Sequence, residues 1–170
     1  MKEIPASRRI QKSRRITRRL VRLPVFKKAR HILAYMPLPD EVATEDFILE
    51  ALKQGKTVYL PRVDRHRRTL SICPVLDLKG NLCRGAFGIW EPKPPGEKLR
   101  GASRGLDLVI APGLGFDSNG ARLGRGGGYF DRFFAKASRA YKIGIAFREQ
   151  RLRSIPVSRH DVRMDAVVTD

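Results

Sequence analysis

Cysteine is scarce in this chain, and long apolar runs are missing. Cys73 and Cys83 are its two cysteines, and their spacing matches neither a metal-binding knuckle nor a redox pair. The longest apolar runs are too short to span a bilayer. Paired arginines near the start are followed by no apolar segment, so no signal peptide is predicted. These absences favour a cytoplasmic protein with reduced thiols and no membrane partner.

Acidic residues are also scarce. The chain has 35 Lys and Arg against 17 Asp and Glu, which gives a net charge of +18. The imbalance is strongest in residues 1–30, where twelve basic residues accompany one acid, Glu3. Such a charge attracts polyanions, for example nucleic acid, nucleotides or polyglutamate-like tails. A solvated basic helix face explains the same composition, so the charge alone selects no partner.

What is present indicates one folded domain of 170 residues, with 42% apolar and 31% charged residues. Short apolar segments alternate with amphipathic ones. Periodicity and capping predict helices at 8–22, 44–54 and 129–140, with Pro24 breaking the first segment. Strands are predicted at 31–36, 57–60, 69–75, 106–111, 141–147 and 166–169, with 91–105 as an irregular connection. Pro74 places the third strand at a sheet edge.

This alternation predicts the fold class: an α/β three-layer sandwich, Rossmann-like, with a mainly parallel central sheet. In such sheets ligands bind beyond the carboxyl ends of the strands. The loops that follow Met36, Leu60, Ala111 and Phe147 are therefore the candidate site loops.

The most informative segment is the glycine loop, residues 113–128, which contains seven glycines. It lies between a predicted buried strand and a predicted helix that begins at Tyr129. Glycines let backbone N–H groups approach a ligand, and a helix N-terminus adds partial positive charge. The loop lacks the Gly-Lys-Ser/Thr ending of a Walker A motif. A structural hairpin is the alternative explanation for the glycines.

Charged side chains surround this loop. Arg122, Arg125 and Arg132 supply cations, and Asp131 lies on the first turn of the predicted helix. Together they suit a polyphosphate that carries a metal ion.

The full string DLVIAPGLGFDSNGARLGRGGGYFDRF closely resembles the signature of the 5-formyltetrahydrofolate cyclo-ligase family. Three further segments resemble that family in the same order: HILAYMPLPDEVATE at 31–45, FGIWEP at 87–92 and IPVSRHDVRMDAVVTD at 155–170. The resemblance covers about residues 13–170. It implies an enzyme that uses ATP and magnesium to convert 5-formyltetrahydrofolate, a reduced folate, to 5,10-methenyltetrahydrofolate.

The resemblance also implies site residues. The ATP phosphate loop would comprise Arg122, Leu123, Gly124, Arg125, Gly126, Gly127, Gly128, Tyr129 and Phe130, with Arg122 and Arg125 as catalytic cations. Magnesium would be bound by Asp131 and Asp161, since it needs only one or two carboxylates beside phosphate oxygens and water. Asp131 would alternatively offset the helix dipole, and Asp165 is the rival of Asp161.

The folate pocket would be formed by Met36, Glu41, Phe87 and Tyr129. A carboxylate at Glu41 can accept hydrogen bonds from pterin N–H groups, although a solvated loop acid fits the same position. Met36 and Phe87 have core packing as their alternative. Phe130 stands where many family members have a second tyrosine, and it falls on the apolar stripe of its helix, so packing is expected there.

One departure concerns the N-terminus, where residues 1–22 form a basic helical segment that is shorter than the family's first helix. That helix usually carries a Lys-x-x-x-Arg-like pair that reaches ATP, and Lys2, Arg8 or Arg9 are candidates to replace it. A second hypothesis follows from this departure: a non-catalytic domain that holds RNA or another polyanion through its basic N-terminus. Nucleic acid is the less favoured partner, because no known RNA motif is visible. A third hypothesis is an unrelated ATP-dependent ligase. We expect a monomer.

Overall fold

A six-stranded sheet forms the centre of the computed structural model, which describes residues 4–93, 105–137, 139–159 and 161–170. Its strands are β1 (His31–Leu33), β2 (Thr57–Asp64), β3 (Thr69–Val75), β6 (Leu108–Ala111), β9 (Tyr141–Ala146) and β10 (Ala166–Thr169). The order across the sheet is β10-β9-β6-β1-β2-β3. All neighbouring pairs are parallel except β2 and β3. The mainly parallel sheet and the edge position of β3 are thus confirmed.

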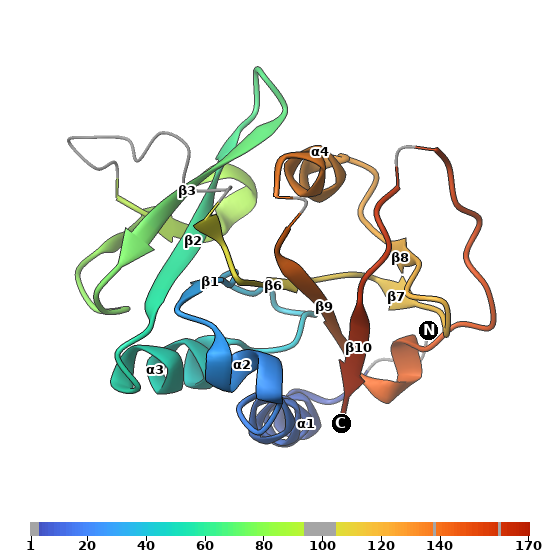
Figure 1. Cartoon of the computed structure of the whole chain (residues 1–170), viewed down its shortest axis with the longest axis horizontal. Coiled ribbons are helices and arrows are strands. Elements are labelled where there is room, and N and C mark those ends of the chain that lie inside the picture. The colour runs from blue at the N-terminus through green and yellow to red at the C-terminus, as the bar shows by residue number, and fades with distance from the viewer. Residues whose placement is uncertain (1–3, 94–104, 138, 160) are drawn as a thin grey trace.

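Helices cover both faces of this sheet (Figure 1). α1 (Ala6–Leu20), α2 (Pro24–Lys28) and α3 (Glu45–Lys53) lie on one face, and α4 (Tyr129–Lys136) lies on the other. Ile16, Phe26 and Phe47 from the first three helices pack in one apolar cluster with β1, β2, β6 and β9. Phe133 and Phe134 of α4 pack in the second cluster, on the opposite side of the same strands. The predicted three-layer arrangement is present.

Several element boundaries differ from the predictions. Pro24 begins α2 instead of only ending the preceding helix, because proline is compatible with the first turn of a helix. β2 continues to Asp64 instead of Leu60, since it pairs with β3 over its whole length. α4 ends at Lys136, four residues early, and β1 ends at Leu33. The predicted connection at 91–105 lies mostly outside the described residues.

Two small hairpins lie outside the six-stranded sheet; the first was not predicted, and the second was considered only as the alternative explanation for the glycines. β4 (Leu82–Arg84) pairs with β5 (Trp90–Pro92) around the short helix η1 (Ala86–Gly88). β7 (Gly115–Phe116) pairs with β8 (Arg122–Leu123), and this hairpin lies inside the glycine loop. The structural hairpin considered for the glycines therefore exists, and it supports the exposed second half of the loop.

Asp117 stabilises the β7–β8 hairpin. Its carboxylate accepts hydrogen bonds from the backbone N–H groups of Asn119, Ala121 and Ile155, at 2.8, 2.9 and 3.1 Å. Burial alone would raise the pKa of Asp117, but these three hydrogen bonds outweigh it and lower the pKa from its usual value. The base of the glycine loop is thereby held by an ionised side chain.

Candidate active site

The exposed half of the glycine loop joins β8 to α4. Gly126 and Gly128 have φ angles of 82° and 62°, which side chains rarely allow. Nothing approaches the position that a Cβ of Gly126 would occupy, so the backbone there faces open space. Within the described part of the chain, no hydrogen bond uses the backbone N–H groups of residues 124–128. Such unused donors beside a helix N-terminus are suited to bind phosphate oxygens.

Arg122 and Asp131 form a paired charge behind this loop. The Nη2 atom of Arg122 lies 2.9 Å from both carboxylate oxygens of Asp131. The Arg122 side chain is only 6% exposed, and that of Asp131 is 21% exposed. The guanidinium also faces the rings of Phe130 and Phe134, at 5.6 and 5.7 Å. Its Nε atom is buried without a partner among the described residues. Asp131 therefore fixes the position of Arg122, and Phe130 has the packing role expected for it.

Arg125 connects the glycine loop to the loop that follows β1. Its Nη2 atom lies 2.7 Å from both carboxylate oxygens of Asp40, and its Nε atom lies 3.6 Å from Glu41. The predicted ATP-binding and folate-binding loops thus touch through this one side chain. Asp40 was not among the predicted site residues. Its position beside Glu41 in the Asp-Glu pair was the available signal.

Glu41 is held in a shielded position. Its side chain is 13% exposed and accepts a hydrogen bond from the Leu38 N–H at 3.0 Å. Burial is the largest influence on this carboxyl and raises its pKa, and the opposing effects of the Leu38 N–H and Arg125 do not cancel it. A poorly solvated carboxylate of this kind gains more from a ligand's N–H groups than a solvated one does.

Three hydrogen bonds hold the backbone around Glu41 in place. The hydroxyl of the buried Ser13, on α1, accepts a hydrogen bond from the Ala43 N–H at 3.0 Å. Tyr35 donates to the Val42 carbonyl at 3.1 Å, and Thr44 donates to the Tyr35 carbonyl at 2.5 Å. Sequence patterns gave these residues no role in the site; Thr44 was predicted only as the cap of the helix that follows, and its hydroxyl makes no capping hydrogen bond. They fix the backbone on both sides of Glu41.

Phe87 and Tyr129, two predicted pocket residues from distant parts of the chain, lie together. Their rings meet edge to face with centroids 6.1 Å apart. Arg65, in the turn between β2 and β3, lies 5.2 Å from the Phe87 ring. Phe87 is 56% exposed and has a φ of 58°, an unfavourable conformation for a bulky residue. An exposed aromatic side chain held at backbone cost indicates a ligand contact.

We call the Phe87 and Tyr129 rings the aromatic wall, and Arg132 packs against it. This arginine lies 5.6 Å from the Tyr129 ring and donates to the carbonyls of Arg68 and Gly127, at 2.7 and 2.6 Å. Each of the three arginines predicted beside the loop therefore has a protein partner: Asp131 for Arg122, Asp40 for Arg125, and two carbonyls for Arg132.

The remaining predicted residues are placed as follows. Met36 is 7% exposed and packs in the first core cluster, and Leu123 is 44% exposed. Asp161 lies on the surface, where its carboxylate accepts a hydrogen bond from the Ser158 N–H at 2.6 Å. Among the described residues, no three His, Cys, Asp or Glu side chains gather around a common point. The roles predicted for Met36 and Asp161 stay predictions.

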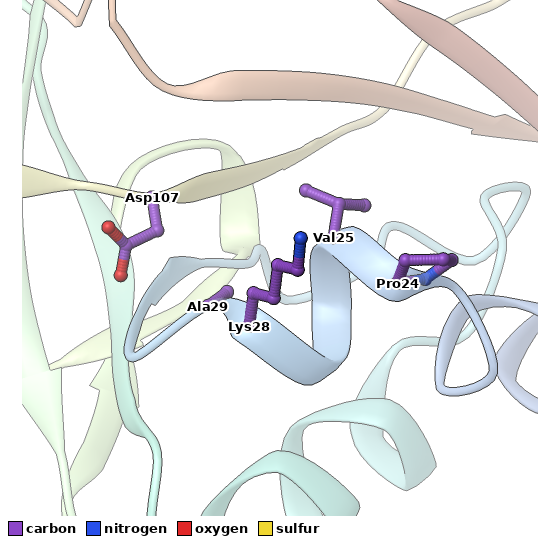
Figure 2. A pocket seen from close by; sticks show the side chains of 5 residues that line it. All are labelled: Pro24, Val25, Lys28, Ala29 and Asp107. Atoms are coloured by element: carbon purple, nitrogen blue, oxygen red, sulfur yellow. The ribbon is translucent and has the colours of Figure 1, made fainter.

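A cavity of about 330 Å³ lies at the end of the strands opposite the glycine loop. It is lined by Pro24, Val25, Lys28, Ala29 and Asp107 (Figure 2). Asp107 precedes β6 and accepts hydrogen bonds from the N–H groups of Arg30 and His31, at 2.7 and 2.9 Å. The cavity is thus at the amino ends of β1 and β6 and contains no predicted site residue. Among the described residues, no helix has the length and apolar character that a membrane crossing requires.

Comparison with known proteins places this geometry in context. The model of the 5-formyltetrahydrofolate cyclo-ligase family matches residues 2–170. The chain is 30% identical over 176 residues to 5-formyltetrahydrofolate cyclo-ligase of Mus musculus, covering 99% of this chain and 87% of that protein. It is 34% identical over 168 residues to the probable 5-formyltetrahydrofolate cyclo-ligase of Schizosaccharomyces pombe, covering 91% and 81%. The solved structure of Aquifex aeolicus 5,10-methenyltetrahydrofolate synthetase superposes with a TM-score of 0.82 at 32% identity, covering 97% of this chain and 81% of that one.

Proposed function

The chain belongs to the 5-formyltetrahydrofolate cyclo-ligase family, and from this premise we propose that it uses ATP and magnesium to close the ring of 5-formyltetrahydrofolate. The product is 5,10-methenyltetrahydrofolate, released with ADP and phosphate. The observation that supports this most strongly is the contact between Arg125 of the glycine loop and the Asp40–Glu41 loop. This contact supports the proposal because it joins the loop proposed to bind phosphate to the loop whose carboxylate is proposed to bind the pterin.

The reaction needs a better leaving group than the formyl oxygen. In the proposed sequence, that oxygen attacks the γ-phosphorus and ADP departs. The neighbouring folate nitrogen then attacks the activated carbon and releases its proton, and the bond between that carbon and the phosphorylated oxygen breaks, so that phosphate leaves as the ring closes. Phosphoryl transfer depends mainly on positioning and on charge neutralisation. The unused N–H groups of residues 124–128 and the arginines beside them supply both.

The residues present fit ATP and fit magnesium in part. Asp131 offers a carboxylate beside the open glycine backbone, and magnesium accepts one or two carboxylates together with phosphate oxygens. When bound, the ion would neutralise phosphate charge. Asp131 would hold it, and Asp161 remains the predicted second ligand. The same carboxylate also pairs with Arg122, whose side chain is 6% exposed.

The proposed folate pocket is formed by Glu41 together with the aromatic wall. Glu41 accepts N–H groups of the pterin from its shielded position, and Phe87 and Tyr129 form an aromatic wall. Arg125 forms an ion pair with Asp40. In the complex, Arg125 would exchange part of that contact for substrate or phosphate oxygens. A ligand bound at the glycine loop would thereby also affect the position of the Asp40–Glu41 loop.

Absorbance spectroscopy tests the proposal. The protein is mixed with ATP, magnesium and 5-formyltetrahydrofolate, and the near-ultraviolet absorbance of methenyltetrahydrofolate is followed. We expect a rise that requires ATP. A folded protein that gives no such rise, or one that turns over a different substrate through the same loop, would reject it in favour of the non-catalytic or unrelated-ligase hypotheses.

Replacing Phe87 by glycine separates ligand contact from packing. Glycine removes the exposed ring and relieves the left-handed backbone, so the melting temperature should stay the same or rise. Loss of an aromatic contact worth about 1.4 kcal/mol should raise the KM for 5-formyltetrahydrofolate about tenfold, with the KM for ATP nearly unchanged. Leu76→Gly, at another strongly exposed apolar residue, is the control. A Phe87→Gly protein that melts lower and binds folate normally would assign this ring to packing.

A further inference from the structure

A row of arginines follows the outer side of α1, and only Arg8 among them is a candidate contact of the proposed site. Arg8, Arg15 and Arg18 lie on the helix, and Arg22 lies in the turn directly after it; all four are exposed. Their intervals of seven, three and four residues keep them on one side of the helix. Ser13, Ile16 and Leu20 occupy the buried side. We call these four residues the arginine row.

Among the described residues, no acidic side chain pairs with this row. The sequence contains no Asp or Glu between Ile4 and Pro39. Among the described residues, the cations of α1 that form ion pairs are Lys12, with Glu149 and Asp170, and Arg14, with Asp46. The arginine row forms none, and its one described side-chain hydrogen bond goes from Arg18 to the Arg14 carbonyl at 3.4 Å, within the same helix. Its guanidinium groups are available to a partner.

The positive surface continues beyond α1. Lys27 and Lys28 are exposed on the last turn of α2, and Arg30 is exposed just before β1. α1 and α2 lie side by side on the face of the sheet opposite α4 (Figure 1). The surface formed by the arginine row and these three residues is called the basic face here. It is separate from the aromatic wall and from the first turn of α4.

The shape and chemistry of the basic face favour an extended polyanion. Arg22 lies fourteen positions after Arg8, which corresponds to about 21 Å along a helix axis. A row of that length suits a linear series of phosphates better than a single small anion. Arginine binds phosphate through two parallel N–H groups, which lysine cannot do.

A membrane surface fits less well. Amphipathic helices that bind membranes insert an apolar face. In α1 that face is in the protein core, where Ile16 is 0% and Leu20 is 1% exposed. We therefore propose that the basic face binds nucleic acid through its phosphate backbone, without reading the sequence.

Two triple variants test this proposal at equal net charge. One is Arg15→Gln/Arg18→Gln/Arg22→Gln; the control is Arg139→Gln/Arg151→Gln/Arg153→Gln, which removes three exposed arginines elsewhere. Binding of labelled 20-nucleotide RNA and DNA of one random sequence is measured by fluorescence anisotropy between 50 and 200 mM salt. Arg8 is left in place because it is a candidate ATP contact.

The row variant should weaken binding to both strands at least tenfold at 50 mM salt. Three lost contacts at about 0.7 each should reduce the slope of log K against log salt by about two. The control should stay within about threefold of the parent, and all three proteins should melt at similar temperatures. Equal losses in both variants, an unchanged slope in the row variant, or binding to phosphatidylserine vesicles but to neither oligonucleotide would each overturn the proposal.

Discussion

Replacing Asp131 by asparagine should lower the turnover number about a thousandfold or more and should also destabilise the protein. The catalytic loss follows because a carboxylate proposed to hold magnesium becomes neutral, and such charge stabilisation is worth several kcal/mol. The loss of stability has a different cause. Arg122 is 6% exposed, so removing its partner leaves a buried cation unpaired, at a cost of about 3 kcal/mol.

The two effects can be separated. Adding Arg122→Met to Asp131→Asn removes the unpaired charge, and the double variant should recover much of the melting temperature without recovering turnover. Calorimetry gives a readout independent of turnover: magnesium should strengthen ATP binding to the parent but not to Asp131→Asn. A variant whose ATP affinity still responds fully to magnesium would remove Asp131 from the proposed metal site.

The same titration decides between Asp161 and Asp165. Asp161→Asn should weaken the magnesium dependence, since this residue is the predicted second ligand. Asp165 accepts a hydrogen bond from the Lys142 N–H at 2.7 Å, where β9 and β10 lie side by side. Asp165→Asn should therefore lower the melting temperature and leave the magnesium dependence intact. The reverse pattern would exchange the two assignments.

Sequence reasoning was most successful where chemistry is encoded locally. The alternation of apolar strands and amphipathic helices was sufficient to predict a mainly parallel sheet with helices on both faces. The glycine loop could be located because left-handed turns at Gly126 and Gly128 require glycine whatever surrounds them. The pairing of Phe87 with Tyr129 depended on the family resemblance, since no periodicity connects residues so far apart in the chain.

The contacts that sequence reasoning missed connect single side chains across the chain. Arg125 and Asp40 are 85 residues apart, and Ser13 and Ala43 are 30 apart. Glu91 belongs to the FGIWEP segment. Its carboxylate accepts a hydrogen bond from the Val63 N–H, which attaches the β4–β5 hairpin to β2, and no pattern in the neighbouring sequence predicts this contact. The hairpin strands themselves are two or three residues long, too short for an alternating pattern to be recognised.

Replacing Glu41 by glutamine should raise the KM for 5-formyltetrahydrofolate about a hundredfold while changing the KM for ATP little. Hydrogen bonds to a charged acceptor contribute about 1.5–3 kcal/mol. The glutamine amide is neutral and has a single acceptor oxygen, so it can accept only one of the pterin N–H groups. The backbone should be unaffected, because glutamine can still accept the Leu38 N–H. Asp40→Asn, which removes the neighbouring charge that binds Arg125, is the matched control.

The pH dependence distinguishes this role from simple loop packing. Burial raises the pKa of Glu41, so in the parent the KM for folate should begin to rise, on acidification, at a higher pH than for an ordinary glutamate. Glu41→Gln should lose that component. Ionisation of Glu41 affects the stability of the fold in the opposite direction: it favours substrate binding but destabilises the folded state. A carboxyl whose pKa is raised by folding stabilises the folded state only while protonated, and this contribution is lost as the pH rises through the folded-state pKa.

At neutral pH the ionised Glu41 therefore costs stability, and Glu41→Gln should melt at a slightly higher temperature than the parent. The difference should disappear below the usual pKa of a glutamate, where the parent is protonated in both states. Thermal melts from pH 4 to pH 8 measure it. If Glu41→Gln melts lower at neutral pH and binds folate normally, Glu41 is a structural acid. If it melts higher and binds folate poorly, the protein retains a shielded carboxylate for its substrate at the expense of stability.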